Sequence, residues 1–101
     1  MDKLMDDISL YVYHNTWHEE GEVVIIRKKW KFDDAVLLNR FASKLWKIVA
    51  REGWTVGSFM DAVVTELGMD RSEVEPQVHR FLEKMIDENL ISTDKITLFD
   101  E

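Results

Sequence analysis

The side chains that could hold a charged partner fall into two groups. Four basic residues crowd into a span of five positions, in a chain whose formal net charge is -7. They are Arg27, Lys28, Lys29 and Lys31. The second group lies on the polar edge of residues 70–90, where Arg80 and Lys84 are four positions apart and therefore share one side of a helix. Both groups have the chemistry to bind carboxylates.

Other reactive residue types do not form a recognisable catalytic pattern. His14, His18, Glu19 and Glu20 span an expected strand end and loop, where a spacing of four does not bring side chains together, so we expect no metal site. The chain has no cysteine, no glycine-rich loop ahead of a helix and no serine in a nucleophile elbow. We therefore expect neither an enzyme nor a bound cofactor.

Length and composition set the scale of the fold. With 101 residues, 46% of them apolar, the chain can build one core, and we expect a single domain over residues 1–101. The charged N-terminus and the lack of any apolar run near ~18 residues predict no signal peptide and no membrane span. Together with the absence of cysteine, this favours a soluble cytoplasmic protein.

The charge distribution narrows the class of partner. A net charge of -7 argues against nucleic acid, because neutralising phosphates requires a basic face. A local basic strip on an acidic body favours a small anionic partner, such as an acidic peptide. A solvated, charged strand edge that resists aggregation would explain the strip equally well.

The periodicity of the first third of the chain predicts a small antiparallel sheet. Residues 8–13 alternate apolar and other side chains, as in a half-buried strand. Residues 15–21 are polar and end in glycine, which favours a turn, and residues 23–26 are β-branched. We expect the two strands to pair as a hairpin and residues 35–38 to add a third strand, although 35–38 could also begin a helix.

Three helices follow, each with end signals. Asn39 can cap a first helix that ends at Gly53, and Thr55 can cap a second that Gly68 closes. The third helix covers residues 70–90. Pro76 is tolerated in a first turn but costs ~3 kcal/mol deeper inside a helix, which favours Ser72 over Asp70 as its cap.

The end of the chain predicts one more element. Residues 90–91 and 96–99, separated by a polar turn, indicate a short C-terminal hairpin. The predicted fold is therefore α+β: a winged helix-turn-helix with an N-terminal three-stranded antiparallel sheet, three helices and this hairpin.

Several of these signals together resemble the PqqD-like proteins, named for pyrroloquinoline quinone synthesis protein D. The resemblance covers somewhat over half of the chain, and Gln77 stands where the family usually has an acidic residue. It rests on Leu38-Asn39, Leu45-Trp46, Gly53-Trp54-Thr55-Val56, Leu67-Gly68-Met69-Asp70, Val74, Val78, Phe81-Leu82, Met85 and Leu90-Ile91.

The resemblance implies a non-catalytic adaptor. Such domains bind the leader of a ribosomally made precursor peptide as an added β-strand, in a groove between the third strand and the third helix. They present the peptide to a separate modifying enzyme, such as a radical S-adenosylmethionine enzyme, a cyclase or a protease. An exposed strand edge suits this mode of binding, since it offers unpaired backbone donors and acceptors.

On that basis the peptide-binding residues can be named. They are Val36, Leu37 and Leu38 on the strand, and Gln77, Val78, Arg80, Phe81, Lys84 and Met85 on the helix. Buried apolar leader side chains, at ~1.5–3 kcal/mol each, should dominate affinity over exposed ion pairs at ~0.2–1 kcal/mol. Two other functions share the same element order: a DNA-binding winged helix-turn-helix regulator, and a structural subunit of a larger enzyme. We expect a monomer, or a weak homodimer through the strand edge.

Overall fold

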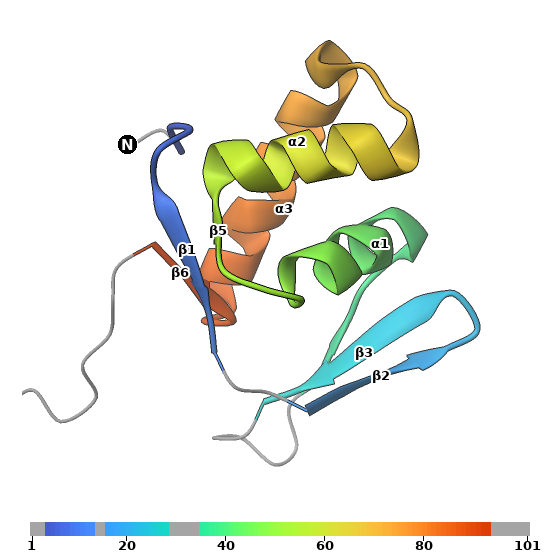
Figure 1. Ribbon diagram of the computed structural model, residues 1–101. Helices are drawn as coiled ribbons and strands as arrows, with labels where there is room; N and C mark the ends of the chain where they lie inside the picture. Colours follow the sequence, from blue (N-terminus) through green and yellow to red (C-terminus); the bar gives the residue numbers. More distant parts are fainter. Residues whose placement is uncertain (1–3, 14–15, 29–34, 94–101) are drawn as a thin grey trace, which may run out of the picture.

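The computed structural model describes residues 4–13, 16–28 and 35–93. Figure 1 shows the order of its helices and strands along the chain. They are β1 (Ser9–Val12), β2 (Thr16–Glu20), β3 (Val23–Arg27), β4 (Ala35–Leu37), α1 (Arg40–Val49), β5 (Trp54–Thr55), α2 (Val56–Leu67), α3 (Arg71–Asp87) and β6 (Ile91–Ser92).

The strands form two small sheets on different sides of the helices (Figure 1). One sheet has the antiparallel order β2-β3-β4, and the other has the order β5-β1-β6. The predicted α+β class, with a three-stranded antiparallel sheet and three helices in a winged helix-turn-helix order, is confirmed. The third strand is also confirmed, since β4 pairs with β3 and does not begin a helix.

The predicted hairpin between residues 8–13 and 23–26 is wrong. β1 pairs with β5 and β6. β3 forms its hairpin with β2, which lies where a turn was expected, and pairs with β4 on its other side. The turn is shorter, at Gly21, whose φ of 66° is in the left-handed region. All five residues of β2 are exposed, so this edge strand has no apolar alternation to reveal it.

Helix ends follow the capping signals for α1 and α2. The Asn39 Oδ1 accepts a hydrogen bond from the Ala42 N–H at 2.8 Å, and Thr55 and Ser58 form a reciprocal capping box. Gly68 closes α2 with a φ of 63°. The predicted end of α1 at Gly53 is wrong, because the helix stops at Val49.

The start of α3 differs from the prediction that favoured Ser72. Asp70 is the N-cap, its side chain makes no capping bond, and its carbonyl accepts hydrogen bonds from the N–H groups of Glu73 and Val74, both at 3.0 Å. Pro76 therefore lies inside the helix. The Ser72 carbonyl that it leaves without a helical donor belongs to an exposed residue, where water can reach it, so the proline is tolerated.

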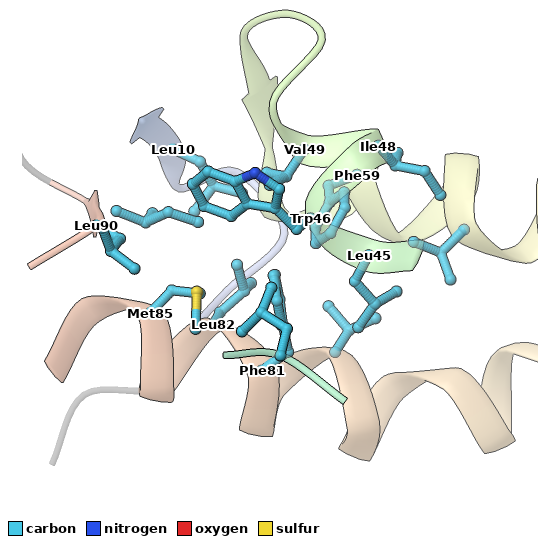
Figure 2. Close-up of a cluster of buried hydrophobic side chains, with 14 of the residues drawn as sticks. Leu10, Leu45, Trp46, Ile48, Val49, Phe59, Phe81, Leu82, Met85 and Leu90 are labelled. Atoms are coloured by element: carbon cyan, nitrogen blue, oxygen red, sulfur yellow. The ribbon is translucent and has the colours of Figure 1, made fainter. Parts of the chain in front are cut away.

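The core lies between the helices and is aromatic at its centre. Trp46 is buried, as expected, and Figure 2 shows it in a cluster with side chains from α1, α2 and α3. The Phe59 ring of α2 lies 6.2 Å from the rings of both Trp54 and Phe81, measured between centroids. Tilted rings at this separation attract one another beyond their buried area.

A buried hydroxyl joins α1 to the edge of the β2-β3-β4 sheet. The Leu38 N–H donates to the Val24 carbonyl at 3.0 Å, but the Val24 N–H donates instead to Ser43 Oγ at 2.8 Å. The Ser43 hydroxyl in turn donates to the Leu38 carbonyl at 3.2 Å. Ser43 thus completes the ladder between β3 and the end of β4, and holds that end against the helix.

We expect Ser43→Ala to destabilise the protein by about 1–3 kcal/mol, because it leaves the buried Val24 N–H without an acceptor. Urea denaturation followed by circular dichroism measures the change. Lys44→Ala, at the exposed neighbouring position, is the control and should change stability by less than about 0.5 kcal/mol. Equal stability of the two variants would contradict this role of the hydroxyl.

The predicted C-terminal hairpin is only partly within the described residues. Ile91 pairs with Val12 of β1, whereas residues 96–99 lie outside the described part of the chain. Within the described residues, no helix is both long and apolar enough to cross a membrane.

Candidate functional site: a groove between β4 and α3

A groove of about 420 Å³ opens between the edge strand β4, the start of α1 and the middle of α3. Its walls therefore come from three elements that are distant in sequence. The lining residues are Leu37, Leu38, Asn39, Phe41, Ala42, Leu45, Gln77, Arg80, Phe81, Lys84 and Met85.

The β4 wall offers free backbone hydrogen-bonding groups. Along two antiparallel strands, directly opposite residues alternate between pairs that exchange backbone hydrogen bonds with each other and pairs whose N–H and C=O groups point outward. Because Leu38 bonds to Val24, the next pair, Leu37 with Ile25, is of the non-bonded kind. The N–H and C=O of Leu37 therefore point away from β3, to the side where no described strand pairs with β4. The Leu37 side chain is 67% exposed.

The floor and the far wall of the groove are apolar and fixed in place. Leu45, Phe81 and Met85 belong to the buried core, and Figure 2 shows Phe81 and Met85 rising from α3 into the cluster of buried side chains that includes Leu45 of α1. Phe41 and Ala42 are half-buried at the start of α1. Because these side chains are held by the core beneath them, the groove is preformed, which lowers the entropic cost of binding.

The α3 rim is polar and basic. Gln77 is turned back on its own helix, donating from Nε2 to the Glu73 carbonyl at 3.2 Å. Arg80 is exposed and has no ion-pair partner among the described residues. Lys84 Nζ lies 3.8 Å from Glu88 Oε2. In the part of the chain that the structure describes, no acidic residue lines the groove.

The structure brings most of the predicted peptide-binding residues to this groove. Leu37, Leu38, Gln77, Arg80, Phe81, Lys84 and Met85 line it. Val36 and Val78 do not, because their side chains are buried in the core behind it. Whether the lining residues contact a peptide stays a prediction.

Four lining residues were not named from the sequence. They are Asn39, Phe41, Ala42 and Leu45. Asn39 and Leu45 were assigned to a cap and to the first helix, and the half-buried Phe41 carried no signal of its own. Sequence spacing alone does not show that these four residues lie beside the free edge of β4. Their position depends on how the start of α1 packs against α3.

The basic strip is not displayed as one surface. Lys28 is only 7% exposed, and its Nζ donates to Glu88 Oε1 at 2.8 Å, which ties the end of β3 to the end of α3. Arg27 is exposed, whereas Lys29 and Lys31 lie outside the described residues. Lys28 therefore supports the fold beside the groove and is not presented to solvent.

The histidine-rich segment shows only a weak pairing. His18 Nε2 lies 3.4 Å from Glu20 Oε2, both on the exposed strand β2, and His14 is outside the described part of the chain. Among the described residues, no three His, Asp or Glu side chains gather closely enough to hold a metal ion.

Comparison with known proteins places this fold in a family. The solved structure of TbiB1 in complex with the TbiA(beta) leader peptide has the same fold, with a TM-score of 0.63 and 16% sequence identity, over 94% of this chain and 100% of that one. A search of curated proteins gives no match. The family model for coenzyme PQQ synthesis protein D (PqqD) matches residues 19–91, which is most of the chain, and the protein therefore belongs to the PqqD family.

Proposed function

We propose that this protein is a non-catalytic adaptor that binds the leader region of a ribosomally synthesised precursor peptide. The leader adds to the β2-β3-β4 sheet as a further strand beside β4 and lies in the groove against α3. The observation that carries the proposal is the outward-facing backbone of Leu37 beside a preformed apolar groove. Backbone pairing supplies affinity in this mode, and the pockets for alternate side chains supply specificity.

The similarity to known proteins supports the proposed leader-binding function. TbiB1, which shares the fold, was solved with a leader peptide bound. Membership of the PqqD family agrees with a role in peptide maturation. The groove has the composition of a peptide site, with an apolar floor and a few polar groups at its rim.

The adaptor acts by presenting the bound precursor to a separate modifying enzyme. A radical S-adenosylmethionine enzyme, a cyclase and a protease are the classes that fit a leader-guided reaction. The chain itself supplies binding and no reaction chemistry. We place this role in the cytoplasm, where precursor peptides are synthesised, and the absence of cysteine is compatible with that compartment.

A DNA-binding role has less support from the third helix. Over residues 70–88, three basic residues stand against six acidic ones, and a recognition helix needs basic or amide side chains toward phosphates and bases. The acidic residues are Asp70, Glu73, Glu75, Glu83, Asp87 and Glu88.

Leu37→Pro tests the proposal at the strand edge. Proline removes the outward N–H of residue 37 without removing a bond to β3, so the protein should remain folded. Losing one backbone hydrogen bond, worth about 0.5–1.5 kcal/mol, should weaken leader binding by up to about tenfold. Titration with synthetic N-terminal segments of short peptides encoded beside the gene, followed by tryptophan fluorescence, measures the affinity.

Leu37→Ala is the matched control, because it shortens the same side chain but keeps the N–H. We expect the proline variant to bind more weakly than the alanine variant. Backbone amide shifts in the wild type should concentrate in residues 35–38 and in α3. Saturable binding whose shifts avoid both regions would contradict the proposed site, and an absence of saturable binding would contradict the function.

A further inference from the structure

We infer that the leader read by this groove presents a carboxylate to Arg80, next to an apolar side chain that fills the hollow lined by Phe41, Phe81 and Met85. The inference rests on the proposed function and specifies the chemistry of the ligand. It assigns different roles to the two basic residues of the rim, Arg80 and Lys84.

The charge of the groove is opposite to that of the whole molecule. The chain has 20 acidic residues against 13 basic ones, yet the described residues that line the groove include two basic side chains and no acidic one. Lining groups of one sign beside an apolar floor favour a ligand of the opposite sign and disfavour a basic peptide.

Of the two basic residues that line the groove, Arg80 is the one without an ion-pair partner among the described residues. Most other described basic residues outside the groove are matched by a nearby carboxylate, as in the pairs Arg40–Glu22, Lys47–Glu19, Arg51–Glu66 and Arg71–Asp61. Arg80 has no such partner among the described residues, although its own helix is rich in acids. A guanidinium can bind a carboxylate through two parallel hydrogen bonds, which makes it a good reader of an acidic side chain.

Lys84 is already engaged. Its ammonium group lies 3.8 Å from one oxygen of Glu88, whose other oxygen accepts a 2.8 Å hydrogen bond from the buried Lys28. Glu88 is therefore held in place by Lys28 and partly neutralises Lys84. A leader carboxylate gains more at Arg80, where no carboxylate of the described residues forms an ion pair with the guanidinium.

Strand geometry sets the spacing of the leader motif. In an added strand, side chains two residues apart point to the same face, about 6.5 Å from each other. The face turned toward the helices meets the apolar floor and the α3 rim together. The ligand class is thus an extended peptide in which Asp or Glu lies two residues from an aliphatic or aromatic residue.

Selection from a display library of random twelve-residue peptides tests this class directly. At low ionic strength, the immobilised wild-type protein should enrich peptides with an acidic residue two positions from an apolar one. The same selection on Arg80→Glu should lose this acidic preference and enrich Lys or Arg there. An enriched wild-type peptide is then synthesised, and its affinity is measured by fluorescence anisotropy.

Lys44→Glu is the control for the change in net charge. Lys44 is exposed on α1, has no ion-pair partner among the described residues and does not line the groove. For the enriched peptide, Arg80→Glu should weaken binding about three- to tenfold at low salt, and added salt should shrink the difference. Lys44→Glu should change binding less than twofold, and Arg80→Lys, which keeps the charge but loses the paired donors, should weaken binding by less than Arg80→Glu does.

Two kinds of negative result distinguish failure of the carboxylate inference from failure of the proposed adaptor function. Enriched peptides without an acidic preference, or equal effects of Arg80→Glu and Lys44→Glu, overturn the inference and leave the adaptor role intact if Leu37→Pro still weakens binding. If no peptide is enriched, or if the enriched peptides bind Leu37→Pro as tightly as wild type, the proposed function fails and the inference falls with it.

Discussion

Replacing Ala42 with tryptophan should weaken leader binding by about ten- to one-hundredfold while the protein stays folded. Ala42 lines the groove from the first turn of α1, and its side chain is half-buried. An indole at this position fills space that a leader side chain would occupy. Burying one apolar side chain is worth about 1.5–3 kcal/mol, and each 1.4 kcal/mol corresponds to a tenfold change in affinity. Titration of the same peptides against both proteins measures the loss.

Lys44→Trp provides the matched control, since it places the same side chain on the same helix at an exposed position outside the groove. It should leave affinity within about twofold of wild type. The Ala42 backbone N–H keeps its bond to Asn39 Oδ1, so the start of α1 should be preserved in both variants. A folded Ala42→Trp protein with wild-type affinity would show that the leader binds elsewhere.

Local signals were sufficient to predict the three helices, the starts of α1 and α2 and the end of α2. Asn39 and Thr55 were recognised as caps because their side-chain oxygens accept bonds from N–H groups at the next helix start, which is a short-range interaction. Gly68 was recognised for the same kind of reason, since the left-handed conformation that closes α2 favours glycine. The end of α2 could therefore be placed, whereas the start of α3 was placed at Ser72 and not at Asp70.

Strand pairing could not be predicted in the same way. The alternation in residues 8–13 correctly indicated a half-buried strand, but its partners Trp54 and Ile91 lie far along the chain, and nothing local specifies them. β2 was missed because a strand exposed on both faces shows no period of two. Similarly, Lys28 gave no sign that it would be buried, because its partner Glu88 is 60 residues away.

The groove itself was predicted in part. The spacing in α3 gave an apolar stripe with Phe81 and Met85 and a polar edge with Arg80, and the resemblance to the PqqD-like proteins suggested that all three face one groove, which they line. Val78 belongs to the same apolar stripe, but it faces the core, and only the packing of α3 against α2 decides which side of a broad stripe remains open. The α1 residues that line the groove could not be predicted, because their place beside α3 depends on the same tertiary packing.

Phe59→Ala should destabilise the protein by about 3–5 kcal/mol, a large part of the 5–15 kcal/mol typical of a small domain. Phe59 is fully buried in α2, and its ring lies 6.2 Å from both Trp54 and Phe81, so it joins the β5 strand to the α3 wall of the groove. Urea denaturation and thermal melting measure the loss, and we expect Tm to fall by more than about 10 °C. Phe59→Leu, which keeps most of the volume, should cost less than half as much. A cost below about 1 kcal/mol for the alanine variant would contradict this packing role, and with it the view that the groove wall at Phe81 is held from behind by the core.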